Sequence, residues 1–246
     1  KLAASVRSSH SIRRVSHLAM PLKVYAIGLS QPARAVHWAL LAEGTDHEII
    51  TTMPGSNKEN GTKHPNYLAK FPFGTVPAID HDGYCLSESH AILTYLGDTF
   101  NWKLYPKDIK LRGRINEILH WHHRNTRQIS IALFAPVVRP DLGIKVETVK
   151  ALTKELGAIF GQFESWLTTS KFLCGDEPTI ADIAAYCEIG QCAPEYCNLF
   201  DFSSYPSIQR WLQVCKQIPG HAESHVMLAQ MGPKIASKAK ALRSKL

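Results

Sequence analysis

The sequence of 246 residues lacks any apolar run near the roughly 18 residues that a membrane-spanning helix needs. None of its six cysteines forms a C-x-x-C pair, and Cys187, Cys192 and Cys197 stand five residues apart, so they share no helical face. A cysteine zinc site is therefore not expected, and the thiols are predicted to be buried and free in a reducing compartment. The sequence contains no zinc-finger or RNA-binding motif.

Acidic residues are scarce at both ends of the chain. Much of the net charge of +7 comes from residues 1–19, which have no acid, and from the lysine-rich segment 232–246. The middle is close to neutral, so neither a nucleic-acid nor a membrane partner is predicted. Residues 1–20 are rich in Ser and Arg, as in an organelle leader.

The basic tail 232–246 ends in Ser244-Lys245-Leu246, the tripeptide that a peroxisomal import receptor binds at a free C-terminus. The predicted location is therefore the peroxisome. The cytoplasm, or another organelle reached through the leader, is the alternative.

Strand and helix patterns alternate over residues 21–101. Strand patterns at 22–27 and 46–52 flank a helical pattern at 33–43, and turn residues mark 53–66 as a loop. A short helix at 66–70, strands at 75–79 and 84–86 joined by Asp82-Gly83, and a helix from residue 88 follow. This order predicts an α/β domain, with a parallel start and a hairpin in one small mixed sheet and helices on its faces.

Beyond a boundary at 101–108 the strand signals disappear. Helical periodicity occupies 108–135, 145–168, 180–192, 204–217 and 221–230, and Pro136 and Pro140 are expected to end the first of these helices. Thr179 and Asp182 form a capping box at the start of another. Residues 108–231 are therefore predicted to form a second, all-α domain.

Ser30 stands where the first strand leads into the first helix. Pro32 suits an early helical position, and the N-terminal N–H groups and dipole of a helix favour an anion. Serine is also a favoured cap, so the local sequence leaves an anion site and a simple cap both open. Ala33, where a capping box has Glu, argues against a purely capping role.

Several separated motifs occur in an order similar to that of theta-class glutathione S-transferases. They are Ser30-Gln31-Pro32, Val76-Pro77-Ala78-Ile79, Ser87-Glu88-Ser89, Trp121-His122-His123 and Thr179-Ile180-Ala181-Asp182. The resemblance covers about residues 22–230. It implies a thioredoxin-like βαβαββα domain followed by an all-helical bundle, a homodimer, and glutathione as co-substrate without a metal. The second substrate would be a small hydrophobic electrophile, and a peroxisomal location would favour organic hydroperoxides.

The resemblance also implies the roles of individual residues. The Ser30 hydroxyl would stabilise the glutathione thiolate, since one charge-assisted hydrogen bond contributes about 1.5–3 kcal/mol, or roughly one to two pKa units. Val76, before a cis Pro77, would pair with the peptide backbone of glutathione. Glu88 and Ser89 would hold the γ-glutamyl group. The glycyl carboxylate needs a cation, for which Lys58, Lys63 and His64 are the candidates, the last two being nearest by position.

One predicted helix carries a polar stripe of His120, His123, Arg124 and Arg127 at i, i+3, i+4 and i+7. Such a stripe usually faces solvent, but it also fits the wall of an anion site. Arg127 matches an arginine that theta proteins direct at the active site, and we assign Arg127 and His123 as second-substrate or anion contacts. Arg124 replaces an acidic residue of some members, which argues against a cross-subunit glutathione contact there. A metal site at Glu117, His120 and His123 is not expected without a second set of ligands.

Two alternative functions remain open. One is a hydrolytic, glutathione-dependent dehalogenase, since theta-like bacterial enzymes have the same serine and fold. The other is a non-catalytic module with the transferase fold. Such modules often lose the activating hydroxyl and the Glu-Ser pair, whereas Ser30, Glu88 and Ser89 are all present here. Arg34 is interpreted as structural, at the interface between the domains.

Overall fold

A four-stranded sheet organises the first domain in the computed structural model, which describes residues 21–243. The elements are β1 (Leu22–Ala26), α1 (Gln31–Ala42), β2 (His47–Thr51), α2 (Pro65–Lys70), β3 (Ala78–His81), β4 (Tyr84–Ser87) and α3 (Ser89–Thr99). The strand order is β2-β1-β3-β4, and only β1 and β2 run parallel. The predicted βαβαββα order is confirmed. The predicted leader 1–20 and the tripeptide at 244–246 lie outside the described residues.

One expected strand begins later than its sequence pattern indicates. The pattern predicts a strand over 75–79, whereas β3 begins at Ala78. Pro77 has no N–H to donate to a neighbouring strand, so the ladder starts after it.

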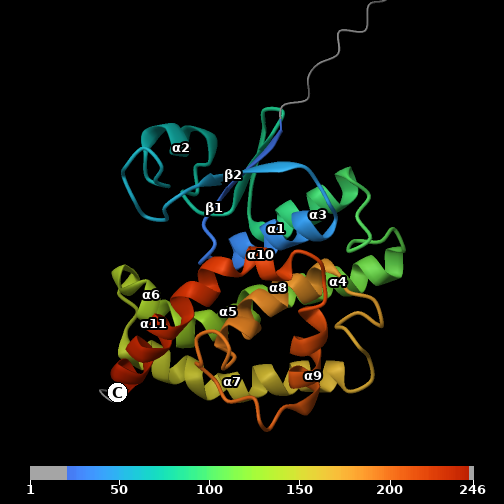
Figure 1. Ribbon diagram of the computed structural model, residues 1–246, viewed down its shortest axis with the longest axis vertical. Coiled ribbons are helices and arrows are strands. Elements are labelled where there is room, and N and C mark those ends of the chain that lie inside the picture. Colours follow the sequence, from blue (N-terminus) through green and yellow to red (C-terminus); the bar gives the residue numbers. More distant parts are fainter. Residues whose placement is uncertain (1–20, 244–246) are drawn as a thin grey trace, which may run out of the picture.

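The alternating side chains of β1 divide the first domain into layers. Val24 is fully buried in the core that α1 and α3 cover, on the side of the sheet that faces the helical domain (Figure 1). Tyr25 points to the other face, where its ring lies 5.8 Å from that of Tyr67 and 4.9 Å from that of Phe71, at α2. The period of two along a strand therefore fixes which helices cover which face.

The second domain is all-helical, as predicted. Its elements are α4 (Ile109–Arg124), α5 (Thr126–Ile129), the π-helical η1 (Ser130–Phe134), α6 (Ala135–Val138), the 3₁₀ turn η2 (Pro140–Leu142), α7 (Val146–Leu167), α8 (Ile180–Ile189), the 3₁₀ turn η3 (Gly190–Cys192), α9 (Pro206–Cys215), α10 (His221–Ser224) and α11 (Val226–Arg243).

Two helical segments differ most from their expected bounds. The helix expected over 108–135 breaks at Asn125, passes through a π turn and continues past Pro136, because that proline occupies the first turn of α6 and needs no N–H partner there. The segment expected to form one helix near 221–230 instead forms α10 and, after a break at His225, the start of α11, which runs on to Arg243. α11 includes part of the segment assigned to a basic tail, and Ile235 and Ala239, one turn apart, are buried there.

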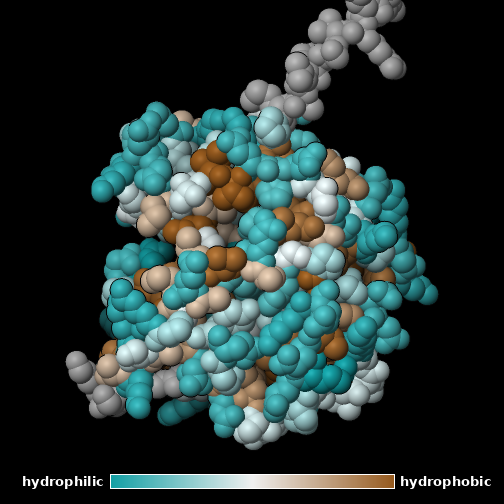
Figure 2. Space-filling model, viewed as in Figure 1, coloured by the Kyte–Doolittle hydropathy of each residue, from teal (hydrophilic) through white to brown (hydrophobic). Residues whose placement is uncertain are grey.

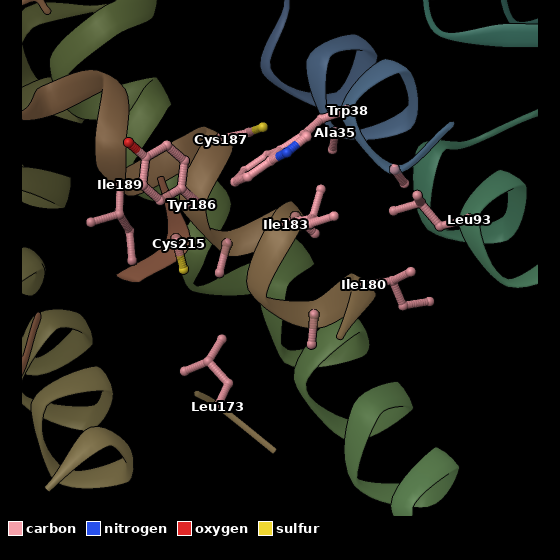
Figure 3. Close-up of a cluster of buried hydrophobic side chains, with 14 of the residues drawn as sticks. Ala35, Trp38, Leu93, Leu173, Ile180, Ile183, Tyr186, Cys187, Ile189 and Cys215 are labelled. Carbon is pink, nitrogen blue, oxygen red and sulfur yellow. The ribbon is translucent and has the colours of Figure 1, made fainter. Parts of the chain in front are cut away.

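The two domains meet at α8, whose residues are all buried. Figure 3 shows Trp38 of α1, Leu93 of α3 and Ile183 of α8 in one cluster of buried hydrophobic side chains. The Trp38 ring lies 5.2 Å from that of Tyr186, and its Nε1 donates to the carbonyl of Pro219 at 3.0 Å. Apolar surface also gathers on one face where the sheet meets the helices (Figure 2). One hydrophobic cluster therefore extends across the junction from the first domain into the second.

Within the described residues, no helix is long and apolar enough to cross a membrane. All six cysteines are free thiols, and four of them are buried.

Candidate active site

The register of the sheet brings four segments to one end of it. Ala26 at the end of β1 pairs with Thr51 at the end of β2. Tyr25 pairs with Ala78, the first residue of β3, and Ala78 pairs in turn with Ser87, the last residue of β4. The chain after β1, β2 and β4 and the chain before β3 therefore emerge at the same edge of the sheet.

These four segments carry the residues predicted to bind glutathione. Ser30 follows β1, the Val76-Pro77 pair precedes β3, Glu88 and Ser89 follow β4, and the 53–64 loop follows β2. The Val76-Pro77 peptide bond is cis, as the resemblance implies. Segments that lie up to 60 residues apart in the chain thus converge because of strand pairing.

Ser30 is the N-terminal boundary residue of α1. Its N–H donates to the carbonyl of Ile27 at 3.0 Å, and its carbonyl accepts from the N–H of Arg34 at 2.9 Å. Within residues 21–243 its hydroxyl makes no capping hydrogen bond, and the residue is only half-buried. The simple cap is therefore not what the geometry shows, and the hydroxyl is available to a ligand at the positive end of α1.

The buried Arg34 side chain fixes the connection between β1 and α1. Its guanidinium donates to the carbonyls of Gly28 and Leu29 at 3.3 and 3.0 Å and, from Nη2, to the carbonyl of Cys187 on α8 at 2.9 Å. The side chain is 1% exposed. Arg34 thus fixes the β1–α1 connection against the helical domain and has the structural role predicted for it.

Glu88 and Ser89 start α3 with an unusual backbone. Glu88 is exposed and has φ 72° and ψ 111°, in the left-handed region that a residue with a Cβ seldom adopts. Such a conformation costs on the order of 1–3 kcal/mol and occurs preferentially at functional sites. Ser89 is the first helical residue, so its N–H and hydroxyl stand at the positive end of α3.

The loop after β2 presents the three side chains that are candidates to bind the glycyl carboxylate. Lys58 and Lys63 are exposed. His64 caps α2, with its Nδ1 accepting from the N–H of Asn66 at 3.3 Å, so the neutral ring carries its proton on Nε2 and can donate it.

The helical domain brings a further cation to this loop, one that the sequence did not indicate. A Cβ added to Gly55 would lie 3.6 Å from Nη2 of Arg139 and 3.9 Å from an oxygen of Asp141. Arg139 and Asp141 form a two-pronged ion pair at 2.8 and 2.7 Å. The η2 segment therefore lies directly against the loop.

Arg127 and His123 do not share the face expected of them. α4 ends at Arg124, and Arg127 belongs to α5, where its Nη1 donates to Oε1 of Glu188 at 2.7 Å and to Oε1 of Gln31 at 3.3 Å. Arg127 therefore stands beside the residue that follows Ser30. The exposed His123 lies instead with its ring 4.9 Å from that of His90, the second residue of α3.

Two family models match the chain, that of the glutathione S-transferase N-terminal domain at residues 20–98 and that of the C-terminal domain at 126–219. The chain belongs to the glutathione S-transferase family. It is 32% identical over 227 residues to glutathione S-transferase T1 of Arabidopsis thaliana, covering 85% of this chain and 89% of that protein. It is 31% identical over 207 residues to human glutathione S-transferase theta-1, covering 79% and 82% of the two chains.

A solved delta-class glutathione transferase of Nilaparvata lugens matches the fold with a TM-score of 0.76 and 28% identity, over 90% of this chain and 99% of that one. The Arabidopsis T1 and human theta-1 relatives confirm the resemblance to theta-class transferases. The protein is a glutathione transferase, with glutathione as its co-substrate.

The sequence did not indicate the polar residues that join the transferase site to the helical domain. Gln31, His122, Ser130, Glu188 and Gln191 are all buried around Arg127. One signal could have pointed to them: Glu188 is a carboxylate in the last turn of a helix that is otherwise almost wholly apolar, and a buried charge requires partners.

Three histidines of the transferase lie close together without forming a metal site. The rings of His122 and His123 lie 4.6 and 4.9 Å from that of His90. Burial lowers the pKa of His90 to about 2, assisted by the neighbouring His122 and His123, so His90 is neutral. Nowhere in the described part of the chain do three or more His, Cys, Asp or Glu residues form a group that could hold a metal ion.

We expect the free energy of unfolding to fall as the pH is lowered from neutral. Burial lowers the pKa of His90 and of His225 to about 2 and that of His221 to about 4. In the unfolded chain these groups titrate near 6.5, so below about pH 6.5 the unfolded state binds more protons than the folded state. Each group then costs about 1.4 kcal/mol per pH unit until the pH reaches its folded pKa.

Thermal unfolding followed by circular dichroism between about pH 7.5 and pH 5.5 measures this decline. The His225→Phe variant is the control, because it removes one of the three protons and should flatten the decline. An unfolding midpoint that stays constant over this range would contradict the prediction.

A cavity of about 1200 Å³ lies elsewhere in the transferase, between α6, α7 and α11. Leu133, Val137 and Leu156 contribute to its apolar lining, and none of the predicted glutathione residues lines it. α11 connects the two regions, because a Cβ on Gly28 would lie 3.1 Å from Cβ of Met227 at the other end of that helix. Ser30, Val76, Glu88 and Ser89 are therefore not among the residues that line the cavity.

Proposed function

We propose that the protein transfers glutathione to electrophiles and that the Ser30 hydroxyl stabilises the attacking thiolate. The observation that carries this proposal is the Ser30 hydroxyl at the start of α1, which makes no capping hydrogen bond. It lies at the edge of the sheet where the cis Val76-Pro77 turn and the Glu88-Ser89 helix start also emerge. A thiolate is a far better nucleophile than a thiol, so a donor aimed at the sulfur accelerates the reaction.

The other parts of the site suit the rest of the tripeptide. The backbone of Val76 can pair with the cysteinyl unit as an added strand. The Glu88 carboxylate suits the γ-glutamyl amine, and the N–H and hydroxyl of Ser89 suit its carboxylate. Lys63 and the Nε2 of His64 are the donors proposed for the glycyl carboxylate at the far end.

Glutathione-dependent turnover of a small alkyl halide tests this function, with loss of free thiol as the measurement. Conjugation consumes one thiol for each halide released. Halide release without loss of thiol would favour the dehalogenase, and retention on immobilised glutathione without turnover would favour the non-catalytic module. Either result would overturn the proposal.

Reduction of organic hydroperoxides is a second reaction of the same thiolate. Attack on the peroxide oxygen gives an alcohol and glutathione sulfenic acid, and a second glutathione converts the sulfenic acid to glutathione disulfide and water. A peroxisomal location, proposed from Ser244-Lys245-Leu246, would supply such substrates. Glutathione-dependent turnover of cumene hydroperoxide tests the reaction. Fluorescence microscopy of the tagged chain tests the peroxisomal location. Solution scattering, which measures the mass of the particle, tests the proposed homodimer.

Glycine at position 88 is expected to stabilise the fold and to weaken glutathione binding. Glu88→Gly removes the strain of φ 72° but also the carboxylate that faces the γ-glutamyl amine. A gain of about 1 kcal/mol would raise the unfolding midpoint by roughly 2–4 °C. The loss of an exposed charge pair with the ligand would raise KM for glutathione about 5- to 10-fold.

The matched control is Glu88→Ala, which loses the carboxylate and keeps the strain. It should show the same rise in KM without the thermal gain. Equal midpoints for the two variants, or an unchanged KM in both, would contradict the prediction.

A further inference from the structure

Glu188, near the end of α8, is a buried carboxylate whose side chain is 2% exposed. Its Oε1 accepts from Nη1 of Arg127 at 2.7 Å, and its Oε2 accepts from the hydroxyl of Ser130. Nε2 of His122 lies 3.6 Å from Oε1. A buried charge is tolerated only with partners of this kind.

The ionisation of this pair follows from its surroundings. Burial by itself would raise the pKa of Glu188, but the charge of Arg127, together with His122 and Ser130, outweighs burial and lowers the pKa. Glu188 in turn raises the pKa of Arg127. At neutral pH both members of the pair are charged.

A closed set of hydrogen bonds leads from Glu188 to the residue after Ser30. Nη1 of Arg127 also donates to Oε1 of Gln31 at 3.3 Å, and Nε2 of Gln31 donates to Oε1 of Gln191 at 2.8 Å. Nε2 of Gln191 then donates to Oγ of Ser130 at 2.6 Å, which returns to Glu188. The start of α1 is thus fixed to α5, η1, α8 and η3 at once.

Arg127 is not fully enclosed by this network. Its side chain is 41% exposed, whereas the carboxylate that holds it is almost completely buried. Its Nη1 group is directed inward to Glu188 and to Gln31, and Gln31 is the first residue of α1 and directly follows Ser30. A π turn, a feature common at functional sites, begins three residues after Arg127.

We propose that Glu188 is a positioning residue for the glutathione thiolate: it holds the Arg127 guanidinium against Gln31, so that the exposed N–H groups of Arg127 supply a second donor to the sulfur beside Ser30. This inference rests on the proposed function, because it requires a thiolate at Ser30. In this proposal Glu188 does not contact glutathione and acts on the pKa of the glutathione thiol through Arg127.

The test is the Glu188→Gln variant, which keeps the shape of the side chain and removes its charge. The readout is the pKa of the thiol in the enzyme–glutathione complex, measured from the ultraviolet absorbance of the thiolate. Without its counter-ion Arg127 is released from Gln31, and the thiol pKa should rise by about one unit, with kcat/KM falling roughly 10-fold near neutral pH. KM for glutathione should change less than twofold, because Glu88, Ser89 and Val76 still hold the peptide.

Two other roles predict different results and would overturn the proposal. If Glu188 acted only through its charge, its removal would favour the thiolate and lower the thiol pKa. If Glu188 only joined the domains, the variant would unfold more readily with an unchanged thiol pKa. Glu164→Gln is the matched control, since Glu164 accepts from the N–H groups of Ser207 and Ile208 elsewhere in the helical domain and should affect stability alone.

Two further variants keep the proposal testable. If Glu188→Gln does not fold, Arg127→Lys keeps the charge but cannot span Glu188 and Gln31, and a thiol pKa equal to that of the wild type there would overturn the inference. In an Arg127→Met background, adding Glu188→Gln should produce no further shift, because Glu188 acts through Arg127. Failure of Ser30→Ala to change the thiol pKa would refute the proposed function itself, whereas an effect of Ser30→Ala without one of Glu188→Gln would refute only this inference.

Discussion

Replacing Ser30 by alanine is expected to lower kcat/KM about 10- to 100-fold near neutral pH, because a hydrogen bond to a thiolate contributes about 1.5–3 kcal/mol. The hydroxyl makes no capping bond in the structure. Its removal should therefore cost the fold little, and the loss should appear in catalysis. Thermal unfolding of the variant separates the two effects, since the midpoint should stay close to that of the wild type.

The pH dependence of the Ser30→Ala variant gives the sharper test. Without the donor the thiol pKa rises by about one to two units, so the acid limb of the kcat/KM profile moves to higher pH by the same amount. The variant should approach the wild type at alkaline pH, where the thiol ionises without help. Ser30→Thr, which keeps a hydroxyl, should retain the position of the limb. A loss that is uniform across the pH range would show that Ser30 does not act on thiol ionisation.

Local signals predicted the elements that bear the site. The handover from strand to helix at Ser30, with Pro32 in the first turn of α1, is encoded within a dozen residues. The alternation of strands and helices was sufficient to predict the sheet, whose register then determines which segments converge. The sequence could not show whether the Ser30 hydroxyl caps α1, because a serine at this boundary serves either role.

The break at Asn125 could not be predicted from periodicity. Apolar spacing continues through the 108–135 segment, yet the helix turns so that Arg127 and Ser130 reach Glu188, more than 50 residues further along the chain. Such a tertiary contact overrides local preference. The segment after residue 232 is interpreted as a basic tail because it is rich in lysine. The structure shows it, up to Arg243, as part of α11, in which Ile235 and Ala239 are buried.

Asp182 sits at the other end of α8 from Glu188 and fixes the start of that helix. One of its oxygens accepts from the N–H of Leu173 at 2.8 Å and from Nε1 of Trp211 at 3.0 Å. The other accepts from the N–H and the hydroxyl of Thr179 at 2.9 and 3.0 Å, which completes the predicted capping box. The carboxylate is 0% exposed, so none of these donors can turn to water instead.

Asp182→Asn is therefore expected to lower the free energy of unfolding by about 3–5 kcal/mol. Asparagine replaces one carboxylate oxygen by an NH₂ group, which cannot accept a hydrogen bond, so the two donors that face it lose their acceptor. Thermal unfolding should show a midpoint lower by roughly 10 °C for a chain of this size. Asp176→Asn, an exposed change in the preceding loop, is the control and should leave the midpoint in place. Below its unfolding temperature the Asp182 variant should keep its thiol pKa and kcat/KM, because Asp182 joins α8 to α9 and does not contact the residues around Ser30. A variant that unfolds like the wild type would mean that the four hydrogen bonds contribute far less than their burial implies.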